Sequence, residues 1–438
     1  MFINKLTLHN FRCFEDVEIE FEEGLTVIVG NNGAGKTAIL EGGVIAASSF
    51  FLGLDGVFSG SISQDDVLLK SYSLGSNDDV QKQYPTYVTA EGDITDGKEW
   101  KRSLNGNGGK TTIVDASVMK KKSRMFQDKL RKGDESLILP IIAYYGTGRL
   151  WDNHRARRET SKDQNIKSTR TNGYIDCIDG TANLKLMNEW FKKQTIRKYQ
   201  YQELGKGKVY ELEAVYNAME RCFSEVTGYT DVKIQYSLDT FELFVNYTNK
   251  NKVTRIPLSL LSAGYKGTIS LIADIAYRMA TLNPHLKENV LTETTGIIFI
   301  DEIDLHLHPT WQQRILSDLT TIFPKVQFIV STHAPAVINT TRSNNLRILS
   351  DYQITEVSQQ VYGNDVNSIL NNIMDADERP LDISNLFKDF YDKLDKCLFD
   401  EAERILDKID DLRETSDKEV SGCRVKLKLE RIRKGVNG

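Results

Sequence analysis

The residues best suited to chemistry lie in a glycine-rich turn near the N-terminus. Residues 30–37 read Gly-Asn-Asn-Gly-Ala-Gly-Lys-Thr and fit G-x-x-x-x-G-K-[ST] in full, between an apolar run and a helical stretch. Backbone N–H groups in such a turn surround phosphates, and the helix N-terminus adds favourable partial charge. Lys36 is predicted to reach the β- and γ-phosphates, and the Thr37 hydroxyl to bind Mg²⁺. The predicted binding residues are Asn31, Asn32, Gly33, Ala34, Gly35, Lys36, Thr37 and Ala38.

Two apolar stretches in the second half end in residues that could complete this chemistry. Residues 296–300 lead into Asp301 and Glu302, and open α/β sheets bind ligands at such strand ends. Asp301 is predicted to be a magnesium partner, and Glu302 to polarise the attacking water. Residues 328–332 lead to His333, which could sense a γ-phosphate by donating a hydrogen bond. Glu302, Lys36 and His333 are therefore the predicted catalytic residues.

A third candidate is the start of a long amphipathic helix. Ser262, Ala263 and Gly264 open it, with Ser262 as a plausible N-cap and Gly264 allowing close backbone approach. A helix start can bind an anion, but the Lys36 turn already holds the phosphates of its own chain. We therefore expect this motif to bind the γ-phosphate of a nucleotide held by another copy. An ordinary helix cap is the alternative.

Hydrophobic periodicity indicates the elements that must position these residues. Alternation predicts strands at 2–8 and 16–22, and residues 54–115 are expected to be irregular apart from a hairpin at 86–104. Residues 183–227 show helical spacing and 232–247 a hairpin, followed by helices at 262–282, 309–322 and 334–340. We expect four regions: an N-terminal lobe at 1–149, an inserted, mostly helical lobe at 150–256, a C-terminal lobe at 257–360 and a helical tail at 361–438.

The composition excludes several classes of protein. The 438 residues carry a formal net charge of −5, so any nucleic-acid surface would have to be local. Five single cysteines without a C-x-x-C pair argue against a disulfide framework and a zinc ribbon. No apolar stretch reaches the roughly 18–20 residues that span a bilayer. A cytoplasmic protein without a membrane segment is expected.

The order of the motifs resembles that of ABC-type ATPases. The segment 301–309, Asp-Glu-Ile-Asp-Leu-His-Leu-His-Pro, and the opening Leu8-His-Asn-Phe-Arg-Cys-Phe14 are similar to the RecF/OLD branch of the ABC/SMC/RecF group. The resemblance implies an α/β fold: an ABC-type head, a mixed β-sheet flanked by helices, with an inserted helical and hairpin lobe and a C-terminal helical extension. It also implies ATP and Mg²⁺ sandwiched in a homodimer or higher homo-oligomer. In that picture Arg12 belongs to the nucleotide site, and Asp304 crosses the dimer interface.

The tail narrows the resemblance. Residues 361–370 and 378–380 are similar to the ATPases of Septu-type antiphage systems and retron operons, which act beside a separate HNH endonuclease. Residues 150–256 lack the sustained heptads of SMC arms, and the stretch after His333 lacks a Toprim pattern, so the chain is not expected to be a nuclease itself. The resemblance implies an ATP-hydrolysing regulatory subunit, with turnover that could be slow, whose tail docks the endonuclease.

Other readings are weaker or remain open. A RecF-like repair ATPase would bind DNA itself through the basic stretches at 120–124 and 155–158, which could equally be solvated faces. DNA or a retron RNA–DNA element could also be a partner of the defence complex. A transporter subunit is disfavoured because Ala263 and Tyr265 replace the usual glycine and glutamine. A zinc site at Asp304, His306 and His308 is disfavoured because alternating residues of an extended segment face opposite ways.

Overall fold

A computed structural model describes residues 1–74, 77–150, 169–180, 184–356, 360–374, 380–412 and 418–434. The chain forms two compact units, Met1–Asn364 and Asp365–Gly438. In these ranges, none of the helices combines the length and apolar character that crossing a bilayer demands. The basic stretch at 155–158 and residues 378–379 of the tail motif lie outside the described residues.

The larger unit is built on a six-stranded sheet with the order β15-β14-β3-β13-β12-β8. Neighbours from β14 to β8 run parallel and β15 is antiparallel, so the sheet is mixed, as predicted. Every residue of β8, β12 and β13 is buried, which explains their near-continuous apolar runs. The strands are β3 (Leu25–Gly30), β8 (Ile141–Tyr145), β12 (Gly296–Ile300), β13 (Val326–Thr332), β14 (Leu346–Ser350) and β15 (Gln353–Glu356).

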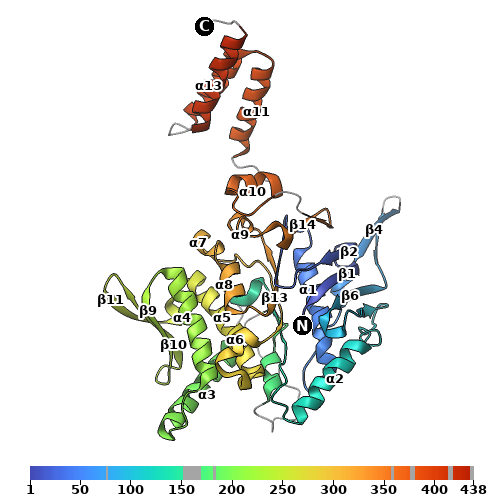
Figure 1. Ribbon diagram of the computed structural model, residues 1–438. Helices are drawn as coiled ribbons and strands as arrows, with labels where there is room; N and C mark the ends of the chain where they lie inside the picture. The colour runs from blue at the N-terminus through green and yellow to red at the C-terminus, as the bar shows by residue number, and fades with distance from the viewer. Residues whose placement is uncertain are drawn as a thin grey trace. The chain divides into compact units, whose positions relative to one another are not determined.

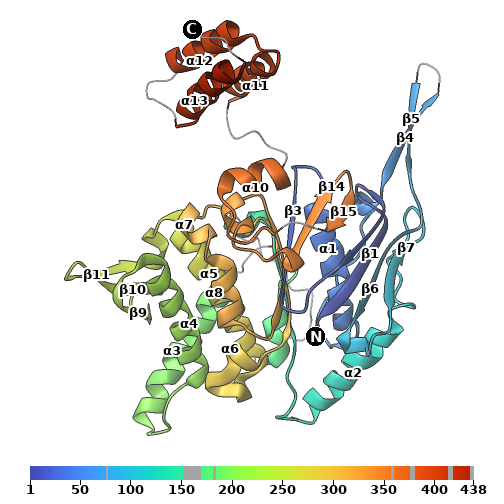
Figure 2. The same cartoon turned by 45° about the horizontal axis from the view of Figure 1, so that its top comes forward.

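Helix α1 (Lys36–Ala47) packs against this sheet and also against a second one (Figure 2). Ten of its twelve residues are buried, so the helix is apolar on all sides rather than amphipathic. Two adjacent glycines make this close packing possible. A Cβ atom on Gly42 would lie 2.5 Å from Leu8 of the second sheet, and one on Gly43 would lie 2.5 Å from Phe299 of β12. The sequence therefore fixes α1 tightly between two layers, with the phosphate-loop motif at its N-terminus.

The second sheet is antiparallel, with the order β2-β1-β6-β7, and the hairpin β4–β5 projects beside it (Figure 2). The hairpin predicted at 86–104 is present. The β4–β5 hairpin lies in a region that was expected to be irregular, and that expectation was wrong there. Helix α2 (Ser117–Arg131) packs against β7 of this layer. The strands are β1 (Ile3–Phe11), β2 (Phe14–Glu20), β4 (Leu69–Leu74), β5 (Asn77–Lys82), β6 (Thr86–Gly92) and β7 (Trp100–Leu104).

The region predicted to be an inserted lobe pairs two helices with a small antiparallel sheet, β11-β10-β9. It contains the predicted hairpin and a third strand that was not predicted. Helix α4 packs along α5, and Phe223 of α4 contacts Tyr265 of α5, with ring centroids 5.7 Å apart. The elements are α3 (Leu184–Glu203), α4 (Tyr210–Thr227), β9 (Thr230–Ser237), β10 (Glu242–Asn249) and β11 (Lys252–Pro257).

The remaining helices of this unit follow the inserted lobe (Figure 1). The helix predicted at 309–322 is broken into two at Gln313 and Arg314. The other predicted helices, at 262–282 and 334–340, are present with shifted ends. They are α5 (Ala263–Leu282), α6 (Val290–Glu293), α7 (Pro309–Gln312), α8 (Ile315–Ile322) and α9 (Pro335–Ile338).

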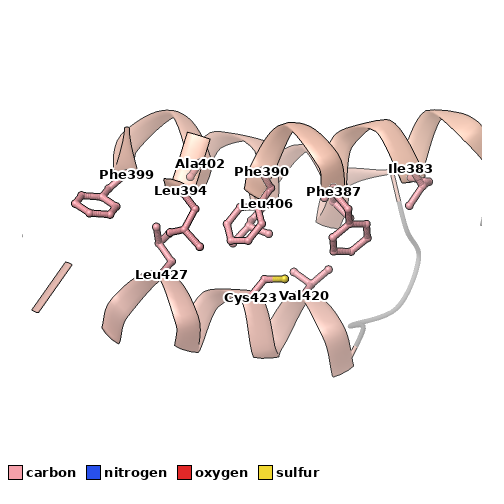
Figure 3. Close-up of a cluster of buried hydrophobic side chains, with 11 residues drawn as sticks. Ile383, Phe387, Phe390, Leu394, Phe399, Ala402, Leu406, Val420, Cys423 and Leu427 are labelled. Atoms are coloured by element: carbon pink, nitrogen blue, oxygen red, sulfur yellow. The ribbon is translucent and has the colours of Figure 1, made fainter. Parts of the chain in front are cut away.

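The smaller unit contains four helices in its described residues and has an apolar core of its own. Figure 3 shows Phe390 of α11 next to Leu406 of α12, and Leu394 of α11 next to Leu427 of α13, in this core. Amphipathic spacing explains the arrangement, because the buried side chains recur every three or four residues on each helix. The helices are α10 (Val366–Ile373), α11 (Leu381–Asp395), α12 (Phe399–Asp411) and α13 (Lys418–Arg433).

Candidate nucleotide-binding site

The glycine-rich turn joins β3 to α1, as predicted. Gly35, the residue before the helix, has a φ of 108°, which side-chain-bearing residues rarely adopt. A Cβ atom at Gly35 would also lie 2.5 Å from the Phe14 ring and 2.7 Å from the Cys13 sulfur. The turn is therefore held against the β1–β2 connection, and its backbone can adopt the shape only with glycine at this point.

Lys36 is buried in the turn rather than extended into solvent. Its ammonium donates to the carbonyl oxygens of Gly30 at 2.8 Å and Asn31 at 3.1 Å. Burial lowers the pKa of Lys36, although the charges of the acidic residues at 301, 302 and 304 raise it. The neighbouring Thr37 donates to Asp301 at 2.7 Å, so the turn and the acidic segment face the same site. A cation held this way is suited to an anionic ligand with several oxygens.

Asp301 is the centre of the site's hydrogen-bond network. It follows β12, is 3% exposed, and accepts from the Thr37 hydroxyl at 2.7 Å and from the Ser331 hydroxyl at 2.5 Å. Its own N–H donates to the carbonyl of Tyr145 on β8, at 2.8 Å. Hydroxyl and carboxylate oxygens side by side are ligands that Mg²⁺ prefers, with water and phosphate completing the shell. Thr37 and Asp301 thus fit a magnesium ion that arrives with a nucleotide.

Glu302 has an unusual backbone conformation. Its φ is +45°, in the left-handed region that costs a non-glycine residue roughly 1–3 kcal/mol. The Ser331 hydroxyl accepts from the Glu302 N–H at 2.8 Å and holds this turn in place. Strain of this kind is often retained at functional positions, and it places Glu302 next to the carboxylate that contacts Thr37.

His333 and Asp304 come together at the end of β13. Asp304 accepts from the Thr332 hydroxyl at 2.5 Å and from the His333 N–H at 3.4 Å. Burial lowers the pKa of His333, and the nearby charge of Lys36 lowers it further, against the raising effect of the three acids. The ring is therefore neutral near pH 7 and can donate one hydrogen bond without adding charge.

Arg12 lies beside α1. It forms ion pairs with Glu41, one turn after Thr37, and with Asp66, where Nε lies 2.9 Å from the carboxylate. Burial lowers the pKa of Arg12, but Glu41 and Asp66 together raise it above its ordinary value. The arginine thus braces the phosphate-loop helix.

The Ser262 motif lies at the surface. Ser262 and Ala263 are exposed, and the Ser262 side chain makes no cap hydrogen bond to the helix it precedes. Gly264 packs against the loop after the acidic strand, because a Cβ atom there would lie 2.8 Å from the carbonyl oxygen of His306. No hydrogen bond in the described part of the chain joins this motif to the phosphate loop. The helix start therefore remains accessible to a ligand outside its own chain.

The structure brings together the phosphate loop, Asp301, Glu302, Asp304 and His333. Gly264 lies beside the His306 carbonyl, and no hydrogen bond among the described residues joins residues 262–264 to the phosphate loop. Two supporting residues were not assigned a role from the sequence: Ser331 and Thr332, whose hydroxyls hold Asp301 and Asp304. The sequence offered one signal for them: two hydroxyl residues end the mostly apolar strand that leads to His333. No group of three or more His, Cys, Asp or Glu within the described ranges could hold a metal ion.

A buried network connects α5 to the site. Asp274 and Arg278 of α5 form an ion pair of 2.7 Å, at 0% and 1% exposure, and the Tyr145 hydroxyl donates to the same Asp274 oxygen at 2.7 Å. The Tyr145 carbonyl accepts from the Asp301 N–H, so Tyr145 contacts both α5 and Asp301. Hydrogen bonds through Tyr145 therefore connect α5, which begins after Ser262, to Asp301 at the end of β12.

Comparisons with known proteins give consistent matches. The model of the AAA domain family matches residues 5–227. A "Retron Vc95 probable ATPase" of Vibrio cholerae serotype O1 biovar El Tor is 27% identical, over 86% of this chain and 80% of that protein. A "Retron Ec83 probable ATPase" of Escherichia coli is also 27% identical, over 85% and 76%. A "Septu protein PtuA" of Bacillus thuringiensis is 26% identical, over 86% and 85%.

Among solved structures, an SMC head bound to the C-winged helix domain of ScpA matches 82% of this chain and 99% of that chain, with 18% identity and a TM-score of 0.45. A structure of the recombination mediator RecF with ATP matches 81% and 99%, with 14% identity and a TM-score of 0.39.

Proposed function

The chain belongs to the AAA domain family, and from this premise we propose that it is an ATPase subunit of an antiphage defence complex. The observation that carries the ATPase assignment is the bond between Thr37 and Asp301, with Lys36 beside it. Those three side chains supply a cation for the phosphates and oxygen ligands for Mg²⁺. The defence role rests on the similarity to Septu and retron-associated ATPases over most of the chain.

In the proposed mechanism, ATP displaces the carbonyl contacts of Lys36, and its ammonium then binds the β- and γ-phosphates. Thr37 and Asp301 would hold Mg²⁺, which would offset phosphate charge. Glu302 accepts a hydrogen bond from the attacking water and orients it in line with the γ-phosphate. His333, neutral beside Lys36, donates a hydrogen bond to a γ-phosphate oxygen.

We further propose that two copies close around two ATP molecules. The first turn at Ser262, Ala263 and Gly264 has accessible N–H groups and would bind the γ-phosphate held by the other copy. Asp304 accepts a hydrogen bond from the His333 N–H and is two residues before His306, whose carbonyl lies beside Gly264. It would therefore couple closure to the site. Closure would control a separate HNH endonuclease docked on the tail, residues 361–438.

The substitution Glu302→Gln tests the ATPase assignment. The variant should bind ATP with wild-type affinity but lose nearly all hydrolysis, by about 100-fold or more, because its amide cannot act as a base. Glu293→Gln, at a half-buried acid that precedes the same strand and pairs with Lys325, is the matched control and should hydrolyse normally. Wild-type hydrolysis by Glu302→Gln would refute the role of Glu302.

The defence assignment has a separate test. An HNH endonuclease encoded next to this chain should co-purify with it after co-expression, and the pair should protect cells from phage. A chain that instead binds DNA alone, in a salt-sensitive and ATP-dependent way, would favour a RecF-like repair ATPase. Against that alternative, Lys122, Arg124 and Arg131 of the basic helix α2 already pair with Asp96 or Asp55.

A further inference from the structure

Helix α13 carries apolar side chains on two opposite faces. Val420, Cys423 and Leu427 point into the core of the smaller unit (Figure 3). Val425, Leu429 and Ile432 are 58%, 61% and 71% exposed, and we call these three residues the outer stripe. At about 100° per residue the two sets fall on opposite sides of the helix. Packing within the unit explains the inward-facing set, but no described residue of the unit covers the outer stripe.

The spacing of the outer stripe has a meaning of its own. Its members are four and three residues apart, so they form one ridge along the helix. Apolar anchors at i, i+4 and i+7 are typical of a helix that packs against another helix. On α11 and α12, by contrast, the exposed large apolar residues lie at the helix ends, at Leu381, Leu398 and Leu412. The outer stripe therefore forms one continuous apolar face, unlike the isolated exposed leucines at the ends of α11 and α12.

The charges beside the stripe are positive. On the helical wheel Lys428 flanks one side. Lys426, whose ammonium lies 4.8 Å from the Tyr391 ring centroid, and Arg433, which pairs with Glu430, flank the other. The helix as a whole has six basic and two acidic residues. On the side of α13 that faces α12, Arg424 forms ion pairs with Asp407 at 2.8 Å and Asp410 at 2.6 Å. Lys428 makes no ion pair with any of the described residues.

The positive charges beside the outer stripe determine which kind of helix can pack on it. A second α13 would bring like charges together, at a free-energy cost. The acidic helix α12, with six acidic and two basic residues, has the right charge, but its exposed positions between Phe399 and Asp411 are polar. Neither surface offers an apolar ridge flanked by acids, so a second copy of this bundle is a poor fit.

We propose that the outer stripe of α13 docks an amphipathic helix of a different protein, with its apolar ridge flanked by aspartate or glutamate. This proposal rests on the proposed function, which includes a separate partner subunit. It identifies the face of α13 that binds this partner and the side chains that the partner presents. Apolar contact supplies most of the affinity, and the flanking cations set orientation and exclude basic helices.

The test uses the full chain and a labelled synthetic helix with leucines at i, i+4 and i+7 and glutamates on both sides. Fluorescence anisotropy should show binding that weakens with salt, and a matched peptide with lysine for every glutamate should not bind. The triple variant Val425→Ser, Leu429→Ser and Ile432→Ser should weaken binding by at least about 30-fold. The matched control, Leu381→Ser with Leu398→Ser and Leu412→Ser, should bind as the wild type does.

Several results would overturn the proposal: no binding to the wild type, equal affinity of the stripe variant, or equal binding of the lysine peptide. Sedimentation of the stripe variant is the second measurement. A smaller assembly than the wild type would mean that another copy of this chain covers the stripe, and would also overturn the proposal. Failure of the proposed function is separately visible, because a wild type without ATPase activity could still bind the acidic peptide through α13.

Discussion

Thr37 and Asp301 are 264 residues apart in the sequence and are joined by a hydrogen bond of 2.7 Å. The bond joins the first turn of α1 to the residue that follows β12. Both groups would turn toward a magnesium ion when ATP binds. The two proposed metal ligands are thus in hydrogen-bond contact without nucleotide, which would reduce the reorganisation needed for catalysis.

The substitution Lys36→Met should abolish ATP binding without harming the fold. The variant removes the phosphate countercharge, and it also removes a buried ammonium whose lowered pKa shows that folding disfavours its charge. Wild-type protein should gain thermal stability on adding ATP and Mg²⁺, whereas the variant should not respond. Lys325→Met, at an exposed lysine, is the matched control and should respond like the wild type. A variant stabilised by ATP as much as the wild type would contradict the role of Lys36.

His333 should make stability depend on pH in one direction. Burial and the charge of Lys36 lower its folded-state pKa, so below about pH 6.5 the unfolded chain takes up a proton that the folded chain refuses. Stability should then fall as pH falls toward the folded-state pKa. His333→Gln should flatten this part of the melting-temperature profile. Parallel profiles for the two proteins would be incompatible with the proposed environment.

The same histidine offers a second measurement. In Lys36→Met the ring loses its cationic neighbour but stays buried, so the pKa of His333 should rise relative to the wild type. An NMR titration of the ring protons measures the shift directly. No rise would mean that the two side chains do not share one site.

The Asp274–Arg278 pair should be costly to break singly. Arg278→Met leaves the Asp274 charge buried, and about 3–5 kcal/mol of unfolding free energy should be lost. The double variant Asp274→Leu with Arg278→Met should recover much of that loss, because no unpaired charge remains. Urea unfolding provides the comparison. A double variant as unstable as the single one would show that the network does more than neutralise charge.

Local motifs were predictable from the sequence, and features decided by packing were not. The phosphate loop and the Asp301–Glu302 pair each sit next to a short apolar strand, so type and spacing identified them. The break between α7 and α8 has no proline or glycine to announce it and follows from tertiary packing. The ion pairs of Arg12 join residues distant in sequence, which a single sequence does not connect.

The tail illustrates the same limit. A helical tail was predicted there, and the core of the smaller unit uses Ala402, Leu406 and Ile409 of α12. In α13, however, apolar residues recur on both sides, so periodicity alone does not say which side is inside. Only the packing against α11 and α12 assigns Leu427 to the core and Leu429 to the surface.

Sedimentation velocity of Glu302→Gln tests the central claim, that one copy's Ser262 turn completes the ATP site of another. With ATP and Mg²⁺ the variant should shift from its nucleotide-free form to a larger closed assembly. Adding Ser262→Arg should abolish the shift while each chain still binds ATP, because the bulky side chain blocks the helix start but leaves the Lys36 loop intact. An undiminished shift in the double variant would contradict the account.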